Sequence, residues 1–343
     1  MISVGIIGGS GYTGKYLVQF CNNHPNIESI SIYGHSTAGK TICQVFPELL
    51  NQVKDSIIMN SKDISFEHDV YFIALPHGEA LNFVPGLIEK NKIVIDLGGD
   101  YRLDDKHEYA KWYKTNHSSP ELLSNKTYGL ADFYDSSFYQ SSLIANPGCY
   151  PTASLLGLLP LTKRFYNKII SASTSAYSGT SGAGKSANAD LSLSEMDGNV
   201  RAYNINAHRH QPEIEQTLHK FGFASPYSFT THLLPACTGI YATTTVFLDS
   251  DMSKESIQEL YTEQYAGSSF VRIRNTPPNL RWVINTNFCD INVNVNKNTI
   301  VITSAIDNLI KGASGQAVQN LNKIFNWEES AGLLKGAMNV SVY

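Results

Sequence analysis

The sequence predicts an α/β protein of two domains, an N-terminal doubly wound parallel sheet and then an α+β domain with a largely antiparallel sheet. Short apolar strands alternate with helical segments through the first 148 residues, and longer strands with fewer helices follow. The 343 residues, 42% of them hydrophobic, also exceed what one small core needs. We expect a first domain over 1–148, completed by a C-terminal helix at about 310–343, and a second domain over 149–309.

The first predicted strand, residues 4–7, runs directly into a glycine-rich turn and a helix over 15–20. Three glycines fall three residues apart in this turn, which allows a tight bend and close approach of backbone N–H groups to a pyrophosphate. A glycine trio alone is weak evidence, but strand, glycine turn and helix is the context that the motif requires. The turn predicts a Rossmann-type dinucleotide site formed by Gly8, Ser10, Gly11, Tyr12, Thr13 and Gly14.

The second strand, residues 27–33, leads into a polar segment over 34–40. That segment lacks the acidic residue that would hold an adenosine ribose 2′-hydroxyl. Ser36, Thr37 and Lys40 supply two hydroxyls and a cation, which suits a 2′-phosphate and favours NADP(H) over NAD. The alternative is an ordinary polar surface loop.

Strands over 69–75 and 92–97, with a helix ending near Glu89, continue the alternating pattern. Ligands of parallel sheets lie at the carboxyl ends of the strands. We therefore expect the segments 74–78 and 96–102 to face cofactor and substrate, through Leu75, Pro76, His77 and Arg102.

The second domain begins at the segment 146–152, which places Cys149 between a short strand over 142–145 and an apolar helix over 153–161. A thiol at a helix N-terminus faces unpaired N–H groups and the positive end of the helix dipole, so its pKa falls. Cys149 is therefore a candidate nucleophile; the alternative is a buried structural cysteine. Longer strands are then predicted over 168–176, 227–234, 240–248, 288–296 and 299–306, with a final helix over 315–325.

Residues 179–186 match G-x-x-x-x-G-K-[ST], the phosphate loop of nucleotide triphosphatases. The preceding segment is polar and serine-rich, the following one is a poor helix, and no apolar run ending in Asp stands downstream. We reject the triphosphatase interpretation, although the loop still offers N–H and O–H donors and the charge of Lys185 to an oxyanion.

His208 and His210 stand just before a predicted helix over 212–220. Two histidines two residues apart are a poor zinc signature without a third ligand. General acid/base work beside Cys149 is the more economical role, and hydrogen bonding at the helix start is the alternative.

Composition excludes several classes of function. The formal net charge is −4, with no basic cluster for nucleic acid and no run of 18 apolar residues for a membrane span. We expect a cytoplasmic protein. Five widely spaced cysteines without a C-x-x-C pair argue against a disulfide framework or a metal site. The β-rich second domain, with exposed strand edges, is compatible with a homo-oligomer, a dimer or tetramer.

Taken together, the motifs resemble the N-acetyl-gamma-glutamyl-phosphate reductases, NADPH-dependent enzymes of arginine biosynthesis related to aspartate-semialdehyde dehydrogenases. The resemblance covers almost the whole chain and rests on residues 8–14, 74–78, 100–103, 128–130, 146–152, 178–184, 208–213 and 307–313. It implies Cys149 as nucleophile and His208 as its acid/base partner. It implies Asn308 as a further cofactor contact. The implied contacts to the acyl phosphate and inorganic phosphate are Arg102, Asn146, Ser178, Gly179, His210, Glu213 and Lys185.

The sequence departs from the family pattern at three places. Thr238 and Lys185 stand where arginines are usual, and Ala131-Asp132 replaces Pro-Glu. A lysine does not replace a bidentate arginine toward a carboxylate or phosphate. Two alternatives therefore remain open: the same chemistry on a succinylated or aminoadipyl acyl phosphate, and an NADP-binding regulator without activity.

Overall fold

The computed structural model describes residues 1–185 and 188–334, and the chain forms two compact units. Unit 1 comprises Met1–Gly148 and the chain from Ala313 onward, and unit 2 comprises Cys149–Gly312. The chain therefore passes between the units twice, at Gly148–Cys149 and at Gly312–Ala313.

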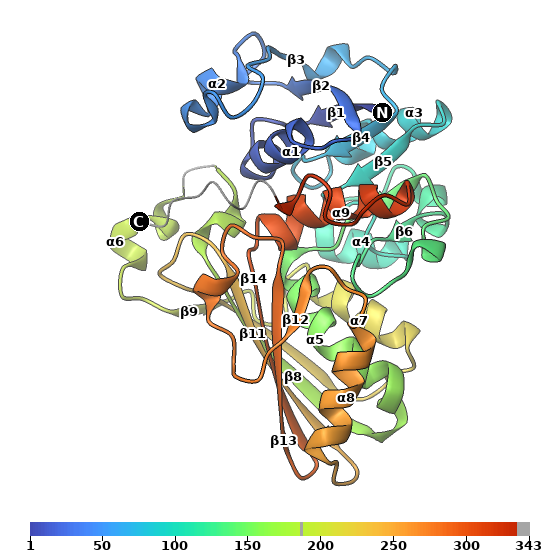
Figure 1. Cartoon of the computed structure of the whole chain (residues 1–343), viewed down its shortest axis with the longest axis vertical. Helices are drawn as coiled ribbons and strands as arrows, with labels where there is room; N and C mark the ends of the chain where they lie inside the picture. Colours follow the sequence, from blue (N-terminus) through green and yellow to red (C-terminus); the bar gives the residue numbers. More distant parts are fainter. Residues whose placement is uncertain (186–187, 335–343) are drawn as a thin grey trace. The chain divides into compact units, whose positions relative to one another are not determined.

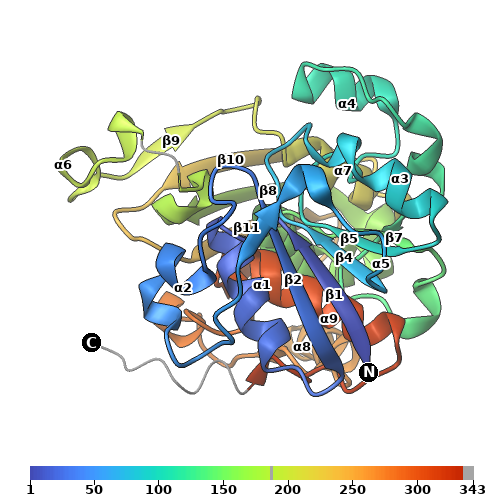
Figure 2. The same cartoon turned by 90° about the horizontal axis from the view of Figure 1, so that it is seen from above.

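Unit 1 is built on a wholly parallel seven-stranded sheet in the order β3-β2-β1-β4-β5-β7-β6 (Figure 1). The central strands are apolar and fully buried, as expected for a parallel sheet covered on both faces. Figure 2 shows β1 and β2 side by side. The strands are β1 (Ile2–Ile7), β2 (Ile27–Gly34), β3 (Ile58–Asn60), β4 (Val70–Ile73), β5 (Ile93–Asp96), β6 (Thr127–Tyr128) and β7 (Leu143–Ala145). The helices are α1 (Tyr12–Asn22), α2 (Ile42–Val45), α3 (Val84–Glu89), α4 (Lys106–Tyr113) and α9 (Gly315–Ile324).

Unit 2 carries a mixed seven-stranded sheet in the order β12-β13-β14-β11-β8-β10-β9. Two strand pairs, β8 with β10 and β12 with β13, are parallel, and the other four are antiparallel. The strands are β8 (Ile169–Ser178), β9 (Arg201–Tyr203), β10 (Tyr227–Leu233), β11 (Ile240–Leu248), β12 (Val271–Ile273), β13 (Cys289–Asn296) and β14 (Thr299–Ile306). The helices are α5 (Cys149–Phe165), α6 (Leu193–Met196), α7 (Gln211–Lys220) and α8 (Lys254–Gln264). The predicted fold class is confirmed.

Helix α5 is the core helix of unit 2. Its residues are buried without interruption from Tyr150 to Thr162, as expected for a helix that is apolar nearly all round. It packs across β8, β11 and β14, while α7 packs against α5 and α8 covers β13. The opposite face of the sheet carries half-buried hydroxyl and aromatic side chains, including Tyr177, Tyr241 and Thr243.

The C-terminal helix is shorter than the predicted range of about 310–343. A π-helical turn, Ile310–Ser314, precedes α9, which ends at Ile324. Asn326 adopts φ +51°, and the N–H of Trp327 donates to the carbonyl of Asn322 at 2.8 Å. A left-handed residue with such a bond is a common helix stop. Residues 335–343 of the predicted range lie outside the described residues.

Candidate active site

Cys149 is the first residue of α5, and its side chain is half-buried. The first N–H groups of a helix have no acceptor within that helix, and the helix dipole adds positive partial charge there. Gly312 packs directly on this residue, because a Cβ at Gly312 would lie 2.6 Å from the Cβ of Cys149. Only glycine permits this approach, so Gly312 fixes one wall beside the thiol.

Asp307 holds the segment that carries Gly312. Its Oδ1 accepts the N–H groups of Leu309 and Ile310 at 2.8 and 3.0 Å, and its Oδ2 accepts that of Asn285 at 2.8 Å. Burial raises the pKa of this carboxyl, while the three backbone donors favour its ionised form. The carboxylate thus caps the π-helical turn from within the fold.

His208 lies in an aromatic surround made by Tyr150, Tyr203, His210 and Phe229. Its ring centroid is 5.2 Å from that of Tyr150 and 6.0 Å from that of Phe229. Burial is the main cause that lowers the pKa of His208, to about 4, and the charge of Arg209 adds to the effect. The imidazole is therefore neutral at physiological pH.

The hydrogen bonds of this cluster fix the tautomer of His208. Its Nδ1 accepts the N–H of His210 at 3.1 Å, so the single proton of the neutral ring is on Nε2. Tyr150 Oη donates to the carbonyl of His232 at 3.3 Å and lies 2.9 Å from Tyr203 Oη. Nε2 of His208 then donates to Tyr203 Oη at 3.5 Å. These contacts connect His208, Tyr203 and Tyr150.

Tyr203 belongs to this site although no sequence motif contains it. It lies in the short edge strand β9. Burial raises the pKa of Tyr203 to about 12, and the nearby Cys149 contributes to the rise. Tyr203 is therefore a protonated hydroxyl close to both predicted catalytic residues, Cys149 and His208.

His210 and Glu213 lie at the start of α7. The ring of His210 is 4.9 Å from that of His208 and 5.9 Å from that of Tyr150. Glu213 is only 1% exposed. Both residues belong to unit 2, which also contains Cys149. A shared unit is what their predicted role as substrate contacts needs.

The loop after β8 is not a phosphate loop. The N–H groups of Gly179, Thr180 and Ser181 donate to the carbonyls of Gly239, Ala236 and Cys237, each at 2.9 Å. A phosphate cradle needs such N–H groups to point at the ligand. These three N–H groups are therefore engaged within unit 2, and oxyanion binding by this loop stays a prediction. Ser178 is buried, and Lys185 is exposed at the last described position before 188.

Asn308 joins this loop to its neighbour. Its Oδ1 accepts the N–H of Gly239 at 2.6 Å, and its Nδ2 donates to Ser181 Oγ at 3.1 Å. The amide of Asn308 thus links the backbone of Gly239 to the side chain of Ser181 within unit 2.

The glycine turn of unit 1 has the expected geometry. Gly8 has φ +90°, and a Cβ there would lie 2.3 Å from the carbonyl oxygen of Ala74. A Cβ at Gly14 would lie 2.4 Å from the carbonyl oxygen of Gly8. No acceptor among the described residues takes the N–H groups of Ser10, Tyr12 or Thr13 at the start of α1. These donors fit a bound pyrophosphate.

The segment after β2 contributes the predicted polar groups. Ser36 and Lys40 are exposed. The hydroxyl of Thr37 is buried and has no hydrogen-bond partner within the part of the chain that the structure describes. In the next loop, Leu75 is half-buried and Pro76 and His77 are exposed, and His77 Nδ1 accepts the N–H of Gly99 at 3.0 Å.

Arg102 and Asn146 are buried in unit 1, with 4% and 0% of their surface exposed. Arg102 Nε donates to the carbonyl of Asn146 at 2.9 Å, and its Nη2 donates to that of Leu97 at 2.7 Å. Both predicted substrate contacts therefore hold backbone at the carboxyl ends of β5 and β7.

The segment 128–132 contacts α9. Gln319 Nε2 donates to Asp132 Oδ1 at 3.1 Å, and Asn320 Nδ2 donates to the carbonyl of Gly129 at 2.9 Å. The Ala131-Asp132 pair thus lies in a segment that packs against a helix of unit 1.

Comparisons with known proteins agree with this geometry. The model described as "Semialdehyde dehydrogenase, NAD binding domain" matches residues 3–139, and "Semialdehyde dehydrogenase, dimerisation domain" matches residues 149–308. The N-acetyl-gamma-glutamyl-phosphate reductase of Vesicomyosocius okutanii is 40% identical over 337 residues, which cover 97% of this chain and 98% of the relative. That of Pelotomaculum thermopropionicum is 41% identical over 342 residues, with 97% of each chain covered. The chain belongs to the N-acetyl-gamma-glutamyl-phosphate reductase family.

Solved structures give the same fold at lower identity. Aspartate semialdehyde dehydrogenase II from Vibrio cholerae, in complex with ASA, has a TM-score of 0.72 at 15% identity, covering 95% of this chain and 98% of its own. Aspartate semialdehyde dehydrogenase with NADP from Candida albicans has a TM-score of 0.68 at 15% identity, covering 95% and 99%. Membership of the reductase family makes the chain an oxidoreductase of amino-acid biosynthesis with a nicotinamide cofactor.

No helix in residues 1–185 and 188–334 combines the length and apolar character that a membrane crossing needs. Within the same ranges, no group of three or more His, Cys, Asp and Glu side chains is arranged to hold a metal ion.

Proposed function

We propose that this chain reduces N-acetyl-γ-glutamyl phosphate to the corresponding semialdehyde and phosphate, with NADPH, through a thioester on Cys149. The observation that carries the proposal is Cys149 at the first residue of a buried helix, backed by Gly312. Tyr203, which contacts the neutral imidazole of His208, is also close enough to Cys149 for the two to interact electrostatically. The named function of relatives 40–41% identical over 97% of the chain supports the substrate.

The residues of unit 1 suit NADPH. The N–H groups of Ser10, Tyr12 and Thr13 lack acceptors among the described residues, and the buried hydroxyl of Thr37 lacks a partner there. We assign the pyrophosphate to residues 8–14 and the 2′-phosphate to Ser36, Thr37 and Lys40. We keep Leu75, Pro76, His77 and Asn308 as further cofactor contacts. Bound NADPH would supply the hydride.

Cys149 acts first as the nucleophile. Its thiolate attacks the acyl carbon, the bond from that carbon to the phosphate oxygen breaks, and phosphate leaves with one proton from solvent. After hydride reaches the thioester carbon, the carbon–sulfur bond breaks, which releases the aldehyde and restores the thiolate. The helix N-terminus stabilises the thiolate at the start and at the end of this cycle.

His208 supplies a hydrogen bond rather than a full proton. The ring is neutral with its proton on Nε2, so it stabilises a developing oxyanion as a donor. This is narrower than the acid/base role that the resemblance implies. The proposed substrate contacts around it are Ser178, Gly179, His210, Glu213 and Lys185.

We propose a cytoplasmic homo-oligomer, a dimer or tetramer, assembled through unit 2. One face of its sheet carries half-buried side chains, including Tyr177, Tyr241 and Thr243, and its residues 149–308 match a dimerisation domain. Analytical ultracentrifugation of the full chain tests this, and a monomer at micromolar concentration would contradict it.

The reaction is tested by following NADP reduction at 340 nm in the reverse direction, with phosphate and N-acetylglutamate 5-semialdehyde. The N-succinyl and aminoadipate semialdehydes run alongside. We expect phosphate-dependent reduction with the acetyl substrate. Activity with only the succinyl or aminoadipate substrate would show that the enzyme acts on a different acyl phosphate. No activity with any of the three substrates would favour an NADP-binding regulator without activity.

Two variants test the residue roles in the same assay. Cys149→Ala keeps NADPH binding and loses turnover by about a thousandfold or more, and ordinary activity would refute the thioester.

His208→Gln, which keeps an N–H donor, lowers kcat about tenfold, whereas His208→Ala lowers kcat about a hundredfold or more. Because the pKa of His208 is about 4, kcat shows no histidine limb near pH 6.5. If the pH profile of kcat showed a titration near pH 6.5 that is absent in His208→Gln, His208 would act as a general acid/base instead.

A further inference from the structure

Asn146 stands three residues before Cys149, and each of its polar groups is engaged in unit 1. Its N–H donates to the carbonyl of Asp96 at 2.8 Å, and its own carbonyl accepts from Arg102. Its Nδ2 donates to the carbonyl of Ala313 at 3.2 Å, and its Oδ1 accepts from Asn320 Nδ2 at 2.9 Å. Four separate segments therefore hold the residue that leads the chain toward the nucleophile.

Asn320 of α9 is the member of this set that comes from farthest along the chain. It is fully buried, and its Nδ2 donates both to Asn146 Oδ1 and to the carbonyl of Gly129, each at 2.9 Å. Its Oδ1 accepts from Tyr139 Oη at 2.6 Å. Gly129 leaves room for it, because a Cβ there would lie 2.5 Å from Asn320 Nδ2.

The amide of Asn320 thus has a fixed orientation. Tyr139 holds the oxygen, and two acceptors take the two hydrogens of the nitrogen, so a flipped amide would place like groups against each other. A side chain held in this way transmits its position to Asn146.

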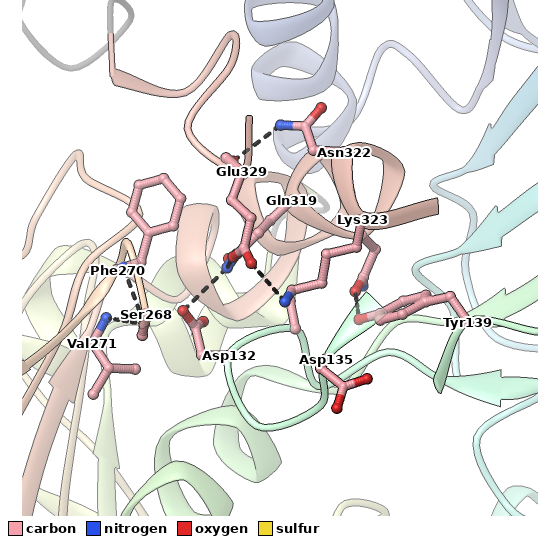
Figure 3. A network of polar contacts seen from close by, with 12 residues as sticks. Asp132, Asp135, Tyr139, Ser268, Phe270, Val271, Gln319, Asn322, Lys323 and Glu329 are labelled. Atoms are coloured by element: carbon pink, nitrogen blue, oxygen red, sulfur yellow. Dashed lines mark hydrogen bonds and ion pairs between the residues drawn. The ribbon is translucent and has the colours of Figure 1, made fainter. Parts of the chain in front are cut away.

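The other polar residues of α9 have different partners. Asn322 Nδ2 donates to the carbonyls of Glu329 and Ala331, each at 3.0 Å, and its Oδ1 is 2.8 Å from His24 Nε2. Lys323 Nζ lies 2.6 Å from Glu329 Oε1. Figure 3 shows Gln319, Asn322 and Lys323 engaged around Glu329, while Tyr139 lies to the other side. Asn322 is therefore a buried asparagine on the same helix without a link to Asn146.

We propose that Asn320 is a positioning residue for Cys149. It acts through Asn146, whose side chain links the segment before Cys149 to Ala313, the residue that follows Gly312. Since Gly312 packs on Cys149, the same bonds set both the entry of the chain into α5 and the residue backing the thiol. The inference rests on the proposed role of Cys149 as nucleophile.

The experiment compares Asn320→Ala with Asn322→Ala in the full chain. One readout is the rate of Cys149 alkylation by iodoacetamide at pH 7, followed by peptide mass spectrometry because Cys237 is exposed and reacts with the same reagent. The other is kcat and KM for the acyl phosphate. We expect Asn320→Ala to lower the alkylation rate and kcat at least tenfold, with KM within twofold.

Asn322→Ala should lower the melting temperature while leaving the alkylation rate and kcat within twofold. Equal effects of the two alanine variants would overturn the proposal. Where Asn320→Ala does not fold, Tyr139→Phe decides, since it removes only the hydroxyl that holds Asn320; a two- to fivefold fall in both rates is expected, and no change refutes the inference. Activity in Cys149→Ala would refute the proposed function separately, because the alkylation rates need no turnover.

Discussion

The loop over residues 8–14 and the loop over residues 179–185 both combine glycines with hydroxyl side chains, and both match nucleotide-binding patterns. Their backbones differ. In the first loop, the N–H groups of Ser10, Tyr12 and Thr13 have no acceptor among the described residues. In the second, those of Gly179, Thr180 and Ser181 donate to carbonyls of the segment 236–239.

This difference shows what makes a glycine-rich loop a ligand site. Burying an N–H group without a partner is costly, so a loop that satisfies its donors internally has little left to offer an anion. A loop at a helix start keeps its donors because the helix geometry supplies no acceptor. Both loops are rich in glycine and hydroxyl residues, and what separates them is whether their backbone N–H groups have acceptors within the protein.

The largest expected effect follows from a single added methyl group in each loop. In Gly14→Ala the new Cβ would lie 2.4 Å from the carbonyl oxygen of Gly8, which deforms the turn. We expect the Kd for NADPH to rise by about 100-fold or more. In Gly182→Ala the Cβ would lie 3.3 Å from Ser178 Oγ, and the Kd should stay within about threefold.

Isothermal titration with NADPH measures both constants, and circular dichroism checks that each variant is folded. If Gly14→Ala bound NADPH with wild-type affinity, the loop over residues 8–14 would not be the cofactor site, and the difference drawn between the two loops would be wrong.

A tenfold effect is expected from two exposed lysines, Lys40 in the segment after β2 and Lys185 at the end of the second loop. A lost charge-assisted hydrogen bond costs roughly 1.5–3 kcal/mol. Lys40→Ala should raise the Kd for NADPH about tenfold, leave NADH binding unchanged and keep the KM for the acyl phosphate. Lys185→Ala should raise the KM for the acyl phosphate about tenfold and leave the Kd for NADPH unchanged. If Lys185→Ala lost NADPH affinity and Lys40→Ala did not, the assignment of the cofactor 2′-phosphate to unit 1 would be wrong.

Strand prediction from the sequence succeeded where apolar and polar residues alternate. The strand Ile240–Leu248 has the predicted bounds, and its residues alternate between a buried and a more exposed face. The strand Thr299–Ile306 also has the predicted bounds, because it is rich in β-branched residues, although it is buried continuously from Ile302 onward. Helices α4 and α8 were missed. Only Tyr109 of α4 and Ile257 and Tyr261 of α8 are buried, so the apolar period that reveals a helix is weak.

The site was predictable only where a motif is contiguous. Cys149 follows from its strand, break and helix, and His208 follows from its neighbours. Tyr203 lies in a three-residue strand without a motif, and Asn320 lies 174 residues from the side chain that it contacts. Such pairings depend on tertiary packing, which spacing along the chain does not encode.

The smallest expected effect compares two hydroxyls, one from each unit. Thr37 Oγ1 is buried without a partner in the described structure, whereas Ser181 Oγ accepts a hydrogen bond from Asn308 Nδ2. Removing an unpartnered hydroxyl relieves a desolvation cost, and removing a paired one leaves its partner unsatisfied. Thr37→Val should therefore leave the free energy of unfolding unchanged or raise it by about 0.5 kcal/mol, while Ser181→Ala should lower it by about 1 kcal/mol.

Urea unfolding of the cofactor-free variants measures these differences, and NADPH titration completes the test. Thr37→Val should weaken NADPH about threefold to tenfold, since its hydroxyl is reserved for the ligand, whereas Ser181→Ala should keep the wild-type Kd. If Thr37→Val destabilised the cofactor-free chain as much as Ser181→Ala does, the Thr37 hydroxyl would have an internal partner. The difference between the two loops would then depend only on the backbone N–H groups of residues 10–13, which have no acceptor among the described residues.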